Sequence, residues 1–278
     1  MIKSLGTENL RNILMEQKTL IIFLTLGDPS LEKTLTYTKV LLDGADILEL
    51  GVPSGLGKYD GPVIRSSYKR AMRGGTTVDS ALKLIEEVPT EKKMVLSYFE
   101  GALQYGLEKF MKLAAGSGAK CVLFPDLLVD YLEEFENYLN ICDKFGLEPA
   151  FFVTSGFPYR LVRKLSCTQP TPAFIYLGLM ASTGTPLPVS VAENIAIIKG
   201  IIGETPLLAG FSIKNSSQVA HCISSGADGV VVGSAIVKRI AESDREDKLL
   251  KELKEHVSEL RKGLSAALLN PARESSCF

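Results

Sequence analysis

Eight short runs of apolar, β-branched or aromatic residues recur along the 278-residue chain, and each has the length of a β-strand. Between the runs, apolar residues return at helical spacing; Leu31, Leu35 and Leu42, for example, share one face with Thr38. Strands and helices that alternate with short connections form parallel βαβ units. Eight such units predict a closed (β/α)₈ TIM barrel, with an open Rossmann-like sheet as the alternative. The runs span residues 20–25, 46–50, 94–98, 121–125, 150–153, 173–177, 206–209 and 229–232.

Two local signals favour the barrel over the open sheet. The first run is followed by Thr25-Leu26-Gly27-Asp28-Pro29, which lacks the G-x-G-x-x-G fingerprint of a dinucleotide-binding Rossmann unit. Gly44, Gly118 and Gly226 each stand between a helical pattern and an apolar run. Glycine at that position suits the left-handed residue that ends a helix. The three glycines therefore predict helix-to-strand junctions.

The size and hydrophobicity of the chain suit one folded unit. A chain of 278 residues, 46% of them hydrophobic, can close one sizeable core. From Arg245 to Leu269, leucines and Val257 fall on one helical face, with Lys and Glu elsewhere. We expect a single (β/α)₈ domain over residues 1–278, with this C-terminal helix packed on the outside to close it. A contact between oligomer subunits is the alternative role for the helix.

The charge balance and the apolar runs restrict the partners. The formal net charge is −1, the pI is about 6.2, and no dense basic stripe is present, which argues against nucleic acid. The longest early apolar run, residues 20–26, is too short to cross a membrane, and no charged segment with a long apolar stretch precedes it. We expect a cytoplasmic protein with no membrane contact, whose partners are small molecules or other proteins.

The cysteines and histidines do not form a recognisable metal or disulfide pattern. The five cysteines are odd in number and lack C-x-x-C spacing, and only Cys222 adjoins a histidine, His221. We expect a buried thiol beside a surface imidazole at this pair. His256 lies in a charged helical segment and is expected to be solvated.

Glu49 stands out because it interrupts an apolar strand. Side chains alternate across a strand, so Glu49 shares a side with Ile47 and lies one residue from the end of the predicted run at Leu50. Active sites of (β/α)₈ barrels lie at the carboxyl ends of the strands. Partial burial there raises the pKa of a carboxyl group and suits it to acid–base chemistry. The alternative is a satisfied polar residue in the upper layer of the barrel.

Asp60 lies in a loop rich in glycine and proline, residues 53–62. Such a loop can hold a carboxylate over the mouth of a barrel, and its glycines leave it free to close on a ligand. An aspartate before glycine is also a common turn residue, which is the alternative for Asp60.

Loops near the end of the chain suit an anion. Gly210-Phe211-Ser212 follows the seventh run, and Gly233-Ser234 follows the eighth and opens a short helix. Backbone N–H groups at glycines and at a helix start can bind phosphate, and phosphate-binding barrels place that site after strands seven and eight. The loop 181–186, which contains Gly184, could cover the same phosphate. The alternative is that these glycines serve only tight turns.

Together these segments resemble the α subunit of tryptophan synthase, a (β/α)₈ enzyme that cleaves indole-3-glycerol phosphate to indole and glyceraldehyde 3-phosphate. The pair E-L-G-V-P and D-G-P at this separation is specific to that family, whereas the glycine loops are shared with many phosphate-binding barrels. The resemblance covers most of the chain and rests on residues 24–29, 48–53, 60–62, 125–127, 183–184, 210–211 and 233–238.

The resemblance implies a role for each site residue. Glu49 matches the general acid/base of the family, and Asp60 matches the carboxylate that binds the indole N–H. Tyr176 resembles the tyrosine that lines this site, and Phe23 and Leu96 would line the indole pocket or belong to the core. No organic cofactor or metal of the chain's own is implied, because pyridoxal phosphate in this family belongs to the β subunit.

The chain departs from the family pattern in four places. Ser212 stands where glycine is usual, and Met180 where arginine is common. The loop before Asp60 lacks the usual Phe-Ser-Asp-Pro, and residues 97–101 lack the common Tyr-Asn-Pro. The departures affect loops that cover phosphate or face a partner.

The resemblance implies a tryptophan synthase β subunit as partner. Leu56 replaces an acidic position of the partner-facing loop, with Lys58 nearby, so we expect assembly with a standard β subunit to be weak or transient. Two alternatives to the lyase stay open. One is a catalytically weak α-like subunit that only binds and activates a β-type partner; the other is a different phosphate-barrel enzyme, such as a Mg²⁺-dependent prenyl or thiamine phosphate transferase.

Overall fold

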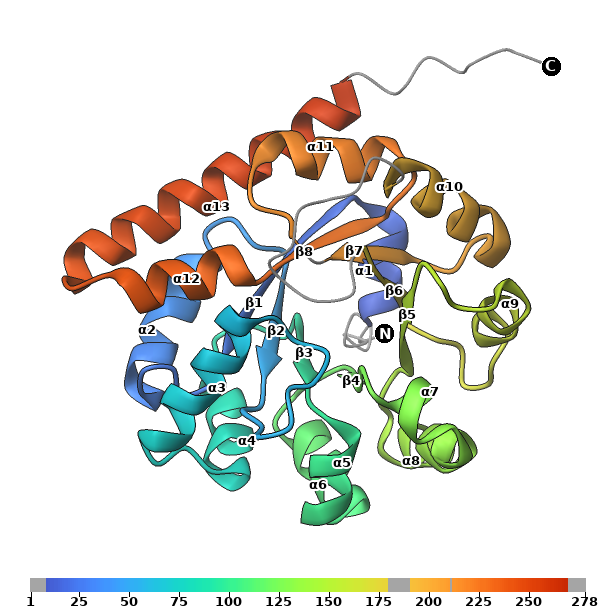
Figure 1. Cartoon of the computed structure of the whole chain (residues 1–278), viewed down its shortest axis with the longest axis horizontal. Helices are drawn as coiled ribbons and strands as arrows, with labels where there is room; N and C mark the ends of the chain where they lie inside the picture. Colours follow the sequence, from blue (N-terminus) through green and yellow to red (C-terminus); the bar gives the residue numbers. More distant parts are fainter. Residues whose placement is uncertain (1–8, 180–190, 211, 270–278) are drawn as a thin grey trace, which may run out of the picture.

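The computed structural model describes residues 9–179, 191–210 and 212–269. Eight parallel strands form a ring inside a ring of helices, and the predicted alternation of strand and helix is confirmed (Figure 1). The strands are β1 (Thr19–Thr25), β2 (Ile47–Gly51), β3 (Lys93–Leu96), β4 (Val122–Leu123), β5 (Ala150–Thr154), β6 (Phe174–Gly178), β7 (Leu207–Gly210) and β8 (Gly229–Val232).

The helices lie before, between and after the strands, and all except α1 cover the outside of the ring (Figure 1). They are α1 (Leu10–Glu16), α2 (Leu31–Leu41), α3 (Pro62–Arg73), α4 (Val78–Glu87), α5 (Phe99–Tyr105), α6 (Leu107–Gly116), α7 (Leu127–Asp130), the short 3₁₀ helix η1 (Leu132–Glu134), α8 (Phe135–Phe145), α9 (Tyr159–Ser166), α10 (Val191–Ile202), α11 (Ser216–Ser224), α12 (Ser234–Glu242) and α13 (Glu246–Leu269).

The strand order is β4-β3-β2-β1-β8-β7-β6-β5, and each neighbouring pair is parallel. In the described part of the chain no ladder joins β4 to β5, although the Glu148 N–H donates to Lys120 O, 2.9 Å away, just before these two strands. The sheet is therefore a nearly closed barrel. An open Rossmann-like sheet is excluded by this order, because β1 lies between β2 and β8.

Strand boundaries differ from the prediction mainly at the third and fourth runs. β3 ends at Leu96, and Tyr98 is the N-cap of α5. β4 has two residues, because the chain turns at Pro125 into α7. The left-handed glycines are confirmed at Gly118 (φ 86°) and Gly226 (φ 111°).

The expectation of a left-handed residue is wrong at Gly44, which has no positive φ. A Cβ at Gly44 would lie 2.6 Å from Cγ1 of Val257 on α13. Glycine is needed there because another helix approaches closely.

The alternation of side chains divides the core into two layers. One apolar layer lies inside the barrel and includes Ile21, Ile47, Met94 and Phe174. The other, larger layer lies between the strands and the surrounding helices. Leu10, Ile13 and Leu14 of α1 belong to the inner layer, so α1 closes the amino-terminal end of the barrel.

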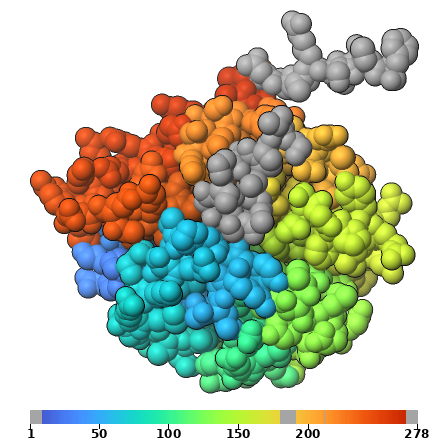
Figure 2. All heavy atoms as spheres, in the orientation of Figure 1, coloured from blue at the N-terminus to red at the C-terminus, as the bar shows by residue number. Residues whose placement is uncertain are grey.

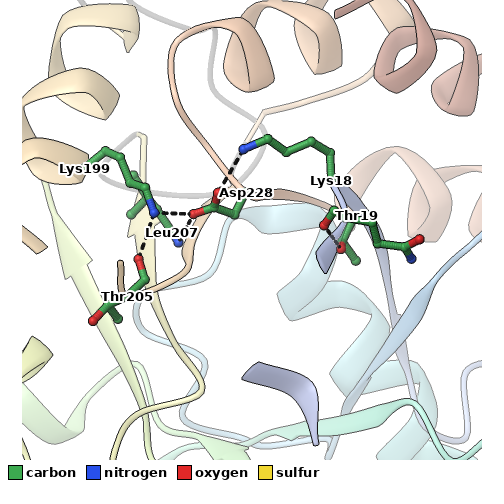
Figure 3. Close-up of polar contacts among 7 residues, drawn as sticks. Lys18, Thr19, Lys199, Thr205, Leu207 and Asp228 are labelled. Atoms are coloured by element: carbon green, nitrogen blue, oxygen red, sulfur yellow. Dashed lines mark hydrogen bonds and ion pairs between the residues drawn. The ribbon is translucent and has the colours of Figure 1, made fainter. Parts of the chain in front are cut away.

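Charged groups at this amino-terminal end are paired with one another. Asp228, just before β8, accepts hydrogen bonds from Lys18 Nζ (2.8 Å), Lys199 Nζ (2.6 Å) and the backbone N–H of Leu207 (3.0 Å) (Figure 3). Lys199 Nζ also donates to the carbonyl oxygen of Thr205. The cluster joins the segments before β1, β7 and β8.

The expected C-terminal helix is α13, which lies across α11, α12 and α2 on the outside of the barrel (Figure 1). The prediction that His256 is solvated is wrong, since its side chain is 7% exposed. His256 follows Leu253 by three residues, and this spacing places it on the buried face of α13. The pKa of His256 is lowered to about 4, mainly by burial and to a smaller extent by the positive charge of Arg239.

The structure also bears on the predictions for Cys222 and His221, for membrane spans and for the extent of the domain. Cys222 is buried and His221 is exposed, as predicted. None of the helices described above has the length and hydrophobicity of a membrane span. The extent of the domain over residues 1–278 stays a prediction, because residues 1–8 and 270–278 lie outside the described part.

Candidate active site

Glu49 points into the barrel from β2. Its register neighbours are Phe23 on β1 and Met94 on β3, both members of the inner layer. The Glu49 side chain is 1% exposed, and Oε1 has no hydrogen-bond partner among the described residues. The pKa of Glu49 is raised to about 8, mainly by burial and to a smaller extent by the negative charge of Asp60. Glu49 is therefore mostly a protonated acid at neutral pH.

Asp60 lies in the loop between β2 and α3 and accepts two hydrogen bonds through Oδ2. The donors are the hydroxyl groups of Tyr98 (2.9 Å) and Tyr68 (3.3 Å). Burial raises the pKa of Asp60 to about 6, although both tyrosines oppose this shift. The two carboxyl groups thus have separated pKa values, so that near pH 7 one is an acid and the other a carboxylate.

The loop that carries Asp60 is anchored to its surroundings. Asp130 on α7 accepts from Lys58 Nζ (2.7 Å) and from the hydroxyl of Tyr59 (2.8 Å). The backbone N–H of Tyr59 donates to the Tyr98 hydroxyl, 3.1 Å away. Figure 2 shows this loop, in blue, lying against the green segments near the mouth of the barrel. The sequence suggested that the glycines make this loop mobile, but in the structure residues 58–60 are held by hydrogen bonds and an ion pair.

A small cavity joins the two carboxyl groups to the ends of strands seven and eight. Its volume is about 30 Å³, enough for a water molecule or two. A larger open groove, of about 820 Å³, lies between α12 and α13 and includes neither Glu49 nor Asp60. The cavity is lined by Phe23, Glu49, Asp60, Ile64, Leu96, Tyr176, Ser212, Ile213, Val231, Gly233 and Ser234.

The cavity therefore brings together most of the residues singled out in the sequence. Gly210 does not line it. Gly184, with Met180 and Phe211, lies outside the described residues. Ile64, Ile213 and Val231 were not predicted; alternation along β8 from Gly233 places Val231 on the inner side and could have identified it.

Glycines at the strand ends make room for the rings of the cavity. A Cβ at Gly51 would lie 2.6 Å from the Phe23 ring, and one at Gly233 would lie 3.1 Å from it. A Cβ at Gly210 would overlap the hydroxyl end of Tyr176. These glycines are thus required by close ring contacts, whatever else their backbone N–H groups bind.

The other end of the cavity is built by β7, β8 and α12. β7 and β8 are neighbours, so Ser212, two residues beyond β7, lies beside Gly233 and Ser234 at the start of α12. Gly233 is the N-cap of α12 and provides no side-chain cap. Helix N-termini carry free N–H groups and a partial positive charge, which suit an anion.

The described residues contain no group of three or more His, Cys, Asp or Glu side chains arranged to hold a metal ion. The two buried carboxyl groups, with their separated pKa values, are suited to acid–base chemistry in a largely apolar cavity that has the start of α12 at its other end. Tyr68, on the helix α3 that follows the loop, and Tyr98, 38 residues from Asp60, were not predicted as part of the site.

Comparison with known proteins agrees with this geometry. The sequence model of the family "Tryptophan synthase alpha chain" matches residues 11–265. The tryptophan synthase alpha chain of Thermococcus kodakarensis is 32% identical over 261 residues, 92% of this chain and 100% of that one. The alpha chain of Geobacter sulfurreducens is 35% identical over 254 residues, covering 89% and 94%.

Solved structures give the same result. A mutant tryptophan synthase alpha subunit from Pyrococcus furiosus superposes with a TM-score of 0.79 at 28% identity, covering 88% of this chain and 98% of that one. The alpha subunit in the Pyrococcus furiosus tryptophan synthase a2b2 complex gives 0.78 at 27% identity, with the same coverage. From its sequence, its barrel and its paired carboxyl groups, the chain belongs to the tryptophan synthase alpha chain family.

Proposed function

We propose that this chain is a lyase of tryptophan biosynthesis that cleaves indole-3-glycerol phosphate to indole and glyceraldehyde 3-phosphate. Family membership supports the reaction class. The observation that carries the proposal is Glu49: a buried carboxyl group with a free oxygen and a pKa raised to about 8, in one cavity with the Asp60 carboxylate. The proposed setting is the cytoplasm, as expected from the sequence.

Glu49 serves as acid and then as base in this proposal. Its protonated form delivers a proton to C3 of the indole ring, which leaves a positive charge on the ring nitrogen. The resulting carboxylate removes the proton from the adjacent side-chain hydroxyl. The carbon–carbon bond to C3 then breaks, its electron pair neutralises the ring, and the hydroxyl carbon becomes the aldehyde. Glu49 ends protonated, ready for the next turnover.

Asp60 stabilises the positive ring. As a carboxylate it accepts a hydrogen bond from the indole N–H, and its charge favours the cationic intermediate over the neutral substrate. Tyr98 and Tyr68 hold the Oδ2 oxygen of Asp60, which leaves Oδ1 for the substrate. Because this carboxylate is already held in place, little free energy is spent on reorienting it during the reaction.

The walls of the cavity supply the rest of the binding site. Phe23, Leu96 and Tyr176 offer apolar contact for the indole ring, and Gly210, Ser212, Gly233 and Ser234, with Gly184, are proposed to hold the phosphate. The present space of about 30 Å³ is too small for a bicyclic ring. Substrate binding therefore requires the walls to move apart.

The direct test is indole release from indole-3-glycerol phosphate, measured with and without a β subunit and with EDTA. Cleavage by the chain alone that EDTA does not affect supports the lyase. Activity only as stimulation of a β-type partner would instead identify a catalytically weak α-like subunit. Failure to cleave indole-3-glycerol phosphate, with an EDTA-sensitive reaction on another phosphorylated substrate, would identify a different barrel enzyme.

We also propose a partner, a β-type subunit that docks beside the loop between β2 and α3. The Pyrococcus furiosus neighbour is solved as an a2b2 complex, which supports such an assembly. Exposed apolar side chains flank the anchor of the loop: Val129 is 52% exposed and Leu132 is 51% exposed. Asp130, between them, is already paired with Lys58.

The assembly is proposed to be weak or transient with a standard β subunit. Leu56 offers no charge to a lysine of the partner, and Asp130 is occupied by Lys58 and Tyr59. Calorimetric titration with a lysine-presenting β subunit, with indole release followed in parallel, tests this. Tight binding with strong activation would contradict it; activation by a partner with an acidic or apolar face would support it.

A further inference from the structure

Ser212 has a backbone conformation that serine rarely adopts. Its φ is 68°, in the left-handed region, and it is the only residue other than glycine with a positive φ in the described ranges. The Cβ of an L-residue crowds the backbone there, so glycine is the residue that adopts this conformation without strain. Strained residues of this kind gather at functional sites.

The hydroxyl group of Ser212 adds a second unfavourable feature. The side chain is 3% exposed, and Oγ has no hydrogen-bond partner among the described residues. Buried hydroxyl groups are nearly always hydrogen-bonded, because desolvation without a partner is unfavourable. Replacement by glycine would remove the strain and the unpaired hydroxyl together, so the folded chain alone provides no reason for serine at this position.

The surroundings of Ser212 indicate what its hydroxyl binds. Ser212 lines the cavity beside Gly233 and Ser234, at the start of α12. No lysine or arginine is among the described residues that line this cavity. The basic residues Lys214, Lys238 and Arg239 line the adjoining groove that Ser234 shares, so an anion inside the cavity contacts neutral N–H and O–H donors directly, and one further O–H group then matters for affinity.

We propose that the Ser212 side chain is itself a phosphate ligand, with Oγ donating a hydrogen bond to a phosphate oxygen of the substrate. This inference rests on the proposed function, because it assigns the phosphate of that substrate to this end of the cavity. Ser212 is thus a specificity-determining residue that favours phosphorylated over unphosphorylated ligands. A bound phosphate provides the acceptor for the Ser212 hydroxyl, which has no partner among the described residues.

The test uses two variants of the full chain and the two halves of the substrate as probes. Ser212→Ala removes the hydroxyl and keeps a Cβ, whereas Ser212→Gly removes both. Calorimetry with glycerol 3-phosphate, and separately with indole, measures the two ends of the site. Ser217→Ala, at an exposed serine of α11, is the matched control.

Both Ser212 variants are expected to bind glycerol 3-phosphate about tenfold more weakly or worse, which is the usual effect of losing a hydrogen bond to a charged group. Their affinity for indole should match that of the wild type. Without ligand, Ser212→Gly should raise Tm by about 2–4 °C through release of strain. Ser212→Ala should raise it less, because alanine keeps the crowded Cβ.

Unchanged glycerol 3-phosphate affinity in Ser212→Ala would overturn the proposal, and so would equal losses of affinity for glycerol 3-phosphate and indole. The outcome is separate from that of the proposed function. If the wild type binds glycerol 3-phosphate but does not cleave indole-3-glycerol phosphate, the lyase assignment fails while the role of Ser212 is still decided by the two variants.

Discussion

Asp228 and Glu49 are carboxyl groups at opposite ends of the same barrel, and their surroundings differ. Asp228, before β8, receives two lysine ammonium groups and a backbone N–H (Figure 3). Burial raises the pKa of Asp228, but the hydrogen bonds from Lys18 and Lys199 outweigh burial and lower it below 3.8. Glu49, near the end of β2, has one oxygen without a partner and a pKa raised to about 8.

The difference separates stability from function within one fold. At the amino-terminal end of the strands, the charge is paired and holds three chain segments together. At the carboxyl end, a buried acid is left without a cation, which destabilises the folded chain but provides a group that exchanges protons near neutral pH. In (β/α)₈ barrels the carboxyl ends of the strands usually carry the active site, and the amino-terminal ends contribute to stability.

The sharpest way to break the comparison is Glu49→Gln, which preserves shape and removes the exchangeable proton. We expect cleavage to fall by roughly 10²–10⁴-fold, the usual contribution of a positioned acid/base. Binding of glycerol 3-phosphate should be unchanged. Steady-state indole release and calorimetry measure the two effects, and near-wild-type turnover would refute the role of Glu49.

The same variant should be more stable than the wild type. The pKa of Glu49 is raised from 4.5 to about 8 on folding, so between these pH values the folded chain binds more protons than the unfolded chain. The free energy of unfolding of the wild type therefore falls as pH rises through this window. Glutamine has no such dependence. The gain in Tm of Glu49→Gln should be larger at pH 8 than at pH 5.

Asp60→Asn tests the second carboxyl group, with a smaller expected effect. The amide still reaches the two tyrosines but carries no charge to stabilise the positive ring. We expect cleavage to fall by roughly 10–100-fold, with glycerol 3-phosphate affinity unchanged. A loss of that affinity in calorimetry would count against an indole-facing role for Asp60.

The pH dependence of kcat/KM should show both groups at once. Activity should fall below about pH 6, where the Asp60 carboxylate is protonated, and above about pH 8, where Glu49 loses its proton. Each limb falls about tenfold per pH unit and is a property of the coupled pair. Asp60→Asn should lose the acidic limb and move the alkaline one to lower pH, because the charge of Asp60 contributes to the raised pKa of Glu49. A flat wild-type profile from pH 5 to pH 9 would contradict the assignment.

The barrel could be predicted from the sequence because its signal is local. Strand runs and helical spacing repeat eight times, and each repeat is visible without knowledge of its neighbours. The predictions are wrong where contacts with other elements of the fold determine the local structure. Tyr98 extends an apolar run yet caps α5, and Gly44 is set by the approach of Val257 rather than by a left-handed turn. The burial of His256 likewise depends on which face of α13 meets α12.

The candidate site divides in the same way. Glu49 was identified because a charge in an apolar strand is anomalous, and position in the barrel then placed it near the mouth. The donors to Asp60 and the anchor at Asp130 were missed, since Asp130 lies far along the chain from the Tyr59 that it binds. The sequence placed Ser212 in the anion loop after the seventh strand and showed that it departs from glycine, but its φ and its unpaired hydroxyl are visible only in the folded structure.

The last prediction concerns the paired end of the barrel and should leave catalysis unchanged. Asp228→Ala removes the acceptor shared by Lys18, Lys199 and the Leu207 N–H. Both lysines are partly exposed, at 30% and 27%, so water compensates part of the loss. We expect the free energy of unfolding to fall by about 2–3 kcal/mol, or Tm by roughly 5–10 °C, with kcat per folded molecule unchanged.

The pKa of Asp228 is lowered on folding, so its contribution to stability is present above about pH 4 and lost as pH falls further. The Tm difference between wild type and variant should therefore shrink in acid. Asp247→Ala is the control, because its ion pair with Arg245 is exposed to solvent, and it should leave Tm nearly unchanged. A loss of kcat in Asp228→Ala at temperatures where it is fully folded would show that the two ends of the barrel are coupled, and the division between them would then fail.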